Sequence, residues 1–63
     1  MAELPQFQKD IRWLFVWAKG QGLPPPTGDR ATAFAERMAI MIFEAGMPER
    51  EAREAAAEST FGR

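Results

Sequence analysis

Two clusters of glycine and proline divide this chain of 63 residues into three segments. The first cluster extends from Gly20 to Gly28 and contains three consecutive prolines, which interrupt both helices and strands. The second cluster is Gly46-Met47-Pro48. No segment alternates apolar and polar residues as a strand does, whereas each segment repeats its apolar residues with the period of a helix. The sequence therefore predicts an all-α protein, a small three-helix assembly that forms one domain over residues 1–63.

The helix ends follow from the residues that cap helices. Gly20 can supply a left-handed cap at the end of the first helix, and Gly46 can do the same for the second. Thr27 or Asp29 offers a side-chain oxygen that caps the start of the second helix. We therefore expect helices at about residues 5–19, 29–45 and 48–59, with a Gly/Pro-rich loop between the first two.

Helical periodicity also predicts which residues face the core. The third helix contributes a narrow stripe of alanines, which allows a neighbouring helix to approach closely. The expected inner faces are Phe7, Ile11, Leu14, Phe15 and Ala18 on the first helix, Ala31, Phe34, Ala35, Met38, Met41, Ile42 and Ala45 on the second, and Ala52, Ala55 and Ala56 on the third.

Large apolar side chains remain outside these inner faces. The chain has eighteen apolar residues larger than alanine, and three short helices leave several of them on the surface. We interpret this surplus as a partner-binding surface, because tryptophan is enriched at protein interfaces. The alternative is that the first helix is covered on two sides, with the proline-rich loop lying on its indoles. The candidate partner-binding residues are Trp13, Val16, Trp17, Ile40 and Phe43.

The composition excludes most catalytic chemistry. The chain has no Cys, His or Tyr, so thiolate and imidazole chemistry is absent. The acidic residues of the third segment are spread around its helix, so we predict neither a metal site nor a catalytic site, no cofactor and no small-molecule substrate. No apolar run approaches the roughly 20 residues of a membrane span, and no export signal is present. We therefore expect a cytoplasmic protein that is not an enzyme.

Two features bear on nucleic acids. Lys9, Arg12 and Lys19 share one flank of the first helix, but three cations with Asp10 among them are few for a polyanion, and the net charge is −1. The junction around Gly46 has the pattern of a helix-turn-helix. However, its second helix carries four carboxylates, Glu49, Glu51, Glu54 and Glu58, which phosphate would repel. Glu49–Arg53 and Arg50–Glu54 are instead spaced as pairs within the helix.

Two partial resemblances involve the second half of the chain. Residues 40–62, with Ala45-Gly46-Met47 and Thr60-Phe61-Gly62, resemble the first two helices of a ubiquitin-associated domain. That family has a third helix with no counterpart in this sequence, so the resemblance implies the helix pair and not ubiquitin binding. Residues 36–57 are similar to a helix pair in replication proteins of plasmids and phages, through Glu36–Met41 and Glu51-Ala52-Arg53. This second resemblance implies an origin in a mobile element.

The sequence thus predicts a small interaction or regulatory protein that binds a protein partner, or itself as a symmetric dimer, through an exposed aromatic helix surface. The alternative hypothesis is a helix-turn-helix-like accessory protein that binds nucleic acid.

Overall fold

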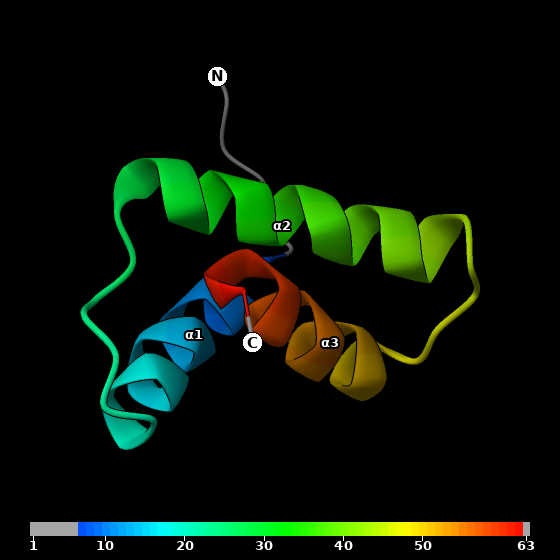
Figure 1. Ribbon diagram of the computed structural model, residues 1–63. Coiled ribbons are helices and arrows are strands. Elements are labelled where there is room, and N and C mark those ends of the chain that lie inside the picture. Colours follow the sequence, from blue (N-terminus) through cyan, green and yellow to red (C-terminus); the bar gives the residue numbers. More distant parts are fainter. Residues whose placement is uncertain (1–6, 63) are drawn as a thin grey trace.

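The computed structural model describes residues 7–62 and confirms the all-α, three-helix fold (Figure 1). The helices are α1 (Gln8–Gly20), α2 (Gly28–Phe43) and α3 (Glu49–Phe61). The predicted start of the first helix at residue 5 lies outside the described residues. The second helix ends two residues earlier than expected, and the third continues two residues further. None of the described helices is both long enough and apolar enough to span a membrane.

The sequence predicts a left-handed cap at Gly20, but the turn after α1 is built around Gly22. Gly22 has φ +75°, and the amide of Leu23 donates a hydrogen bond of 2.8 Å to the carbonyl of Ala18. The amide of Gly22 donates to the carbonyl of Lys19 at 3.1 Å. These two bonds form a Schellman motif, in which the left-handed residue stands two positions beyond the last helical residue. The helix therefore runs through Gly20, and the chain turns sharply back at Leu23.

The other helix ends are defined by a threonine and two glycines. Thr27 caps α2, and its hydroxyl accepts a hydrogen bond of 3.2 Å from the amide of Arg30. α2 ends at Phe43, and Gly46 has φ +70° in the wide turn that follows. Gly62 has φ +73° and ends α3. The predicted Thr27 cap is thus confirmed, whereas Gly46 lies further beyond the end of its helix than expected.

α2 lies across the other two helices, and α1 and α3 both pass beneath it (Figure 1). The largest fully buried apolar side chains are Phe34, Leu14 and Met38. α3 contributes alanines to the core, so its backbone can approach α2 closely. The buried alanines of α3 are Ala52, Ala56 and Ala57. Ala57 is buried although it was not among the expected core residues of the third helix. Ala55, which was expected in the core, is only partly buried.

The inner face of α1 is rotated relative to the expected one. Leu14 and Ala18 are fully buried, as predicted. Phe15, which we also expected in the core, is 44% exposed. Asp10, which we expected on the polar flank of the helix, is only 1% exposed. The core side of α1 has therefore turned toward its tryptophans and away from Phe15.

Candidate functional site

Trp13 and Trp17, which we expected on the outer side of the first helix, lie against the core. Their rings stack on each other, with centroids 6.1 Å apart. Trp13 also stacks on Phe34 of α2 at 6.5 Å, and Trp17 contacts Phe61 of α3 at 5.7 Å. Both indoles are partly buried and pack against the core. The expectation that they point away from the core is therefore wrong.

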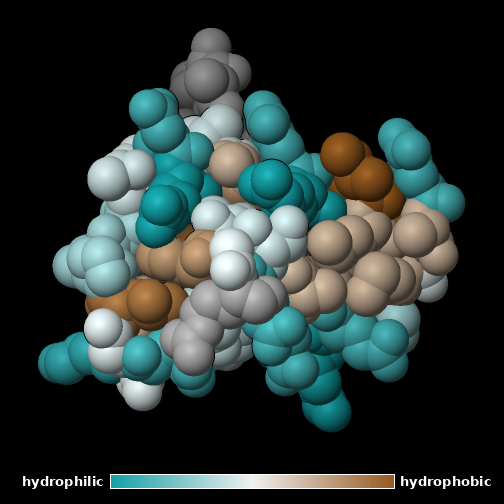
Figure 2. All heavy atoms as spheres, viewed as in Figure 1, coloured by the Kyte–Doolittle hydropathy of each residue, from teal (hydrophilic) through white to brown (hydrophobic). Residues whose placement is uncertain are grey.

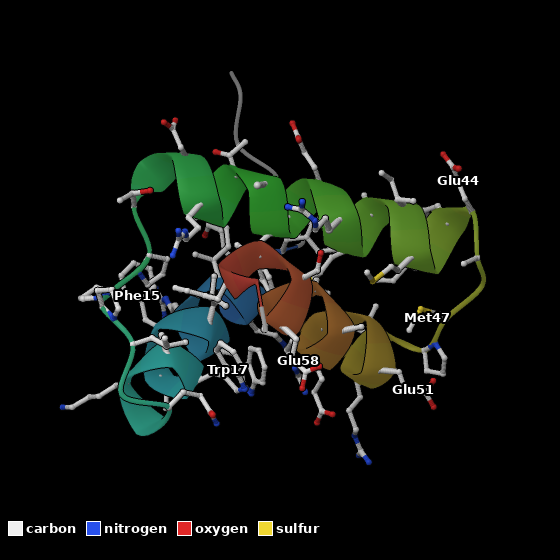
Figure 3. The ribbon with its side chains drawn as sticks, viewed as in Figure 1. Phe15, Trp17, Glu44, Met47, Glu51 and Glu58 are labelled. Atoms are coloured by element: carbon white, nitrogen blue, oxygen red, sulfur yellow. The ribbon has the colours of Figure 1, made fainter. Side chains whose placement is uncertain are left out.

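The end of α3 explains this difference. The predicted third helix stops near Ser59, whereas α3 continues to Phe61 and brings a benzyl ring to Trp17. Figure 3 shows Trp17 on the side of α1 that faces α3. The indoles are thus covered by aromatic rings from the other two helices. The proline-rich loop lies on the other flank of α1, where Leu23 and Pro25 line a hollow beside Phe15.

Two guanidinium groups lie over this aromatic cluster. The guanidinium carbon of Arg53 lies 5.0 Å from the ring centre of Trp13, and that of Arg30 lies 4.7 Å from the ring centre of Phe61. Cations over aromatic faces are attracted by the ring quadrupole. The cation over Trp13 of α1 therefore comes from a different helix, α3.

Arg53 also neutralises the buried Asp10. Its Nη1 donates a hydrogen bond of 3.2 Å to Oδ1 of Asp10. This is the ion pair found among residues 7–62, so the expected Glu49–Arg53 and Arg50–Glu54 pairs do not form there. Asp10 lies four and eight residues before two buried positions, Leu14 and Ala18, and this spacing was the signal that could have identified it as buried.

The carboxyl group of Glu49 lies beside the carboxyl group of Asp10. When both groups are ionised, Oδ2 of Asp10 has no hydrogen-bond donor among the described residues. Two carboxyl groups can share a hydrogen bond only when one of them is protonated. The pKa of Glu49 is therefore raised above its usual value, first by this hydrogen bond and next by the negative charge of Asp10. The arrangement links the start of α3 to α1.

An open hollow of about 470 Å³ lies between the outer side of α1 and the loop that follows it. We call it the α1 hollow; it is lined by Phe15, Val16, Lys19, Leu23 and Pro25. The Schellman motif turns Leu23 back toward α1, and the prolines restrict the chain beyond it. Figure 3 shows Phe15 beside this loop. Val16, a predicted contact residue, is 71% exposed here. Sequence reasoning missed Phe15, Leu23 and Pro25 because periodicity does not show how a loop folds back.

The outer face of α1 is basic. Lys9, Arg12 and Lys19 are exposed, and Val16 lies one turn from Arg12 and from Lys19. We call these three cations the basic rim. Asp10, the acidic residue of α1, is buried beneath Arg53 and does not offset them at the surface. An apolar hollow with Arg12 and Lys19 beside it is suited to an apolar group with acidic neighbours.

A second apolar surface lies at the far end of α2. Ile40 is 54% exposed and Phe43 is 71% exposed, as the sequence predicted. Glu36 and Glu44 are exposed one turn on either side of Ile40. We call these four residues the α2 end surface. Apolar atoms gather at this end of the molecule and, separately, near α1 and the proline-rich loop (Figure 2). The predicted single contact surface is therefore divided into two surfaces at opposite ends of the molecule (Figure 1).

The remaining surface of α3 is acidic. Glu49, Glu51, Glu54 and Glu58 are exposed and outnumber the exposed Arg50, while Arg53 is held by Asp10. Among residues 7–62, no group of three or more carboxylates is arranged to hold a metal ion. This face of α3 would repel phosphate.

Comparisons with models of protein families, with curated proteins and with solved structures find no match to this chain. The two partial resemblances of the second half therefore stay predictions, and the functional argument depends on the surfaces described above.

Proposed function

We propose that this protein is a non-enzymatic protein-binding domain, and that its docking surface is the α1 hollow with the basic rim. The observation that carries this proposal is the juxtaposition of exposed Val16 and Phe15 with the exposed cations Arg12 and Lys19 on α1. The partner that fits is a protein segment with an apolar side chain between acidic residues. Its apolar group would enter the hollow, and its carboxylates would lie against Lys19 and Arg12.

The size of the hollow agrees with one or two inserted side chains. A contact that removes about 200 Å² of apolar surface from water contributes about 5 kcal/mol at about 25 cal/mol per Å². Association and the ordering of side chains offset part of this energy. The cations add orientation and association rate more than affinity. We therefore expect binding in the micromolar range.

The fixed shape of the hollow lowers the cost of binding. Leu23 is held by a hydrogen bond of 2.8 Å to the end of α1, and Pro25 stands in a run of three prolines. A wall that is already ordered loses little conformational entropy when a partner binds. The hollow thus favours recognition of a short segment without rearrangement of this domain.

Nucleic acid binding receives less support. Proteins that bind single strands stack bases on exposed aromatic rings, whereas both indoles here are packed in the aromatic cluster. In the helix-turn-helix alternative, α3 would meet the phosphates with Glu51, Glu54 and Glu58 exposed. On the basis of the sequence alone, we also propose a regulatory role, a cytoplasmic location and an origin in a mobile element.

The proposal is tested by selecting binding peptides from a random displayed library. We expect the wild-type protein to enrich peptides that place an aromatic or aliphatic residue between Asp or Glu residues. The Val16→Asp variant should lose them, and the Ile40→Asp variant, changed at another exposed apolar position, should keep them. If the selected peptides bind Val16→Asp as tightly as the wild type, or if a single-stranded polynucleotide displaces them, the proposal is wrong.

A further inference from the structure

The two exposed apolar surfaces carry opposite charges. In the α1 hollow, Val16 has Arg12 and Lys19 one turn away. In the α2 end surface, Ile40 has Glu36 and Glu44 one turn away, with the partly buried Arg37 as the neighbouring cation. The α2 end surface therefore has the chemistry that the α1 hollow is suited to bind: large apolar groups between carboxylates.

We propose that the partner of the α1 hollow is the α2 end surface of a second copy of this chain. Phe43 of one copy enters the hollow beside Val16 of the next, and the carboxylates of Glu36 and Glu44 approach the basic rim. This inference rests on the proposed function, because it names the partner of the same surface.

The charges favour this head-to-tail contact over the symmetric dimer that the sequence suggested. A two-fold contact between α1 faces brings Lys9, Arg12 and Lys19 against their own copies, and like charges brought together weaken association. The two surfaces also lie at opposite ends of the molecule, toward the end of α1 and the end of α2 (Figure 1). One copy can thus bind a neighbour at each end. Such a contact produces rings if the rotation closes and open chains if it does not.

Two exposed positions allow each end to be blocked separately. Val16 and Phe43 are both 71% exposed, so replacing either with aspartate leaves the core intact. Val16→Asp blocks the α1 hollow and keeps the α2 end surface. Phe43→Asp blocks the α2 end surface and keeps the α1 hollow.

The test is analytical ultracentrifugation of the wild type, of each variant and of their mixture. We expect the mass of the wild type to rise with concentration above the 7.1 kDa of one chain, and each variant alone to stay at 7.1 kDa. An equimolar mixture should form a complex of two chains and grow no further, because each remaining end is blocked. A monomeric wild type at millimolar concentration, or a variant that dimerises alone, would overturn the inference.

Charge reversal provides a second readout. Lys19→Glu should weaken self-association by up to about fivefold, as expected for one exposed ion pair. A mixture of Lys19→Glu and Glu44→Lys should restore the affinity of the contact between the changed hollow and the changed α2 end surface. The control Arg50→Glu on α3 should leave self-association unchanged. If Lys19→Glu strengthens self-association, the pairing of surfaces is wrong. If the wild type binds the selected acidic peptides but never self-associates, the inference fails while the proposed function stands.

Discussion

Replacing Trp13 with alanine tests whether the indoles belong to the core. From the sequence, Trp13 lies outside the core and its loss should cost under about 1.5 kcal/mol of unfolding free energy. In the structure its ring contacts Trp17 and Phe34 and lies beneath Arg53. The same substitution thus has different consequences under the two descriptions.

The expected loss can be built from these contacts. Each aromatic pair contributes about 0.5 to 1.5 kcal/mol, and a cation over the ring contributes about 0.5 to 1 kcal/mol. Transfer of a large apolar side chain from water contributes about 1.5 to 3 kcal/mol. Because Trp13 is only partly buried, the lower values apply, and they predict a loss of about 3 kcal/mol for Trp13→Ala. A domain of this length is stable by only about 3 to 9 kcal/mol, so the variant should be close to unfolding.

Urea denaturation followed by far-ultraviolet circular dichroism measures this loss. Trp13→Phe, which keeps an aromatic ring, should lose less than Trp13→Ala and provides a folded variant for comparison. Val16→Ala is the control at an exposed apolar position of the same helix and should change stability by less than about 0.5 kcal/mol. A loss below about 1.5 kcal/mol for Trp13→Ala would refute the assignment of the indole to the core.

Three further changes test local features of the fold. Glu49→Gln should raise the urea midpoint near neutral pH, because the amide keeps a hydrogen-bond donor for Asp10 without adding a second negative charge. The protonated Glu49 of the wild type stabilises the fold below its usual pKa of 4.5, and this contribution is lost as the pH rises through its raised pKa. The gain from Glu49→Gln should therefore shrink toward acid pH, and a gain that does not shrink would contradict this. Gly22→Ala should cost about 1 to 2 kcal/mol because its φ is +75°, whereas Gly20→Ala, inside the helix, should stabilise by about 0.5 to 1 kcal/mol; thermal melts giving the reverse order would place the turn at Gly20. Phe61→Ala should lower the unfolding free energy by about 2 to 4 kcal/mol by removing the ring that covers an indole, and an unchanged value would separate the end of α3 from the core.

The sequence predicted the fold because its strongest signals are local. The prolines and glycines divide the chain, and the helical period places Leu14, Phe34 and Met38 inside, where the structure has them. The cap at Thr27 was also predictable from residue type, since its hydroxyl lies next to the amides at the start of a helix.

The arrangement of the surface was less predictable because it depends on contacts between distant residues. Asp10 is buried by Arg53, which is 43 positions away, and no local pattern indicates this pairing. Trp17 is covered by Phe61, whose position depends on where α3 ends. Because the indoles face the core, the exposed apolar surface of α1 consists of Val16 and the side chains that line the α1 hollow. The exposure of Ile40 and Phe43 was predicted correctly, but their separation from Val16 depends on how the helices cross.

The central claim, that the α1 hollow binds the α2 end surface of another copy, is tested most directly by backbone amide resonances recorded over a dilution series from millimolar to low micromolar concentration. We predict concentration-dependent shifts in two groups of amides, one around Val16 and Leu23 and the other around Ile40 and Phe43, with the same midpoint for both groups. The amides along the exposed acidic face of α3 should not shift. Shifts confined to one of the two surfaces, or spectra that do not change with concentration, would contradict the account.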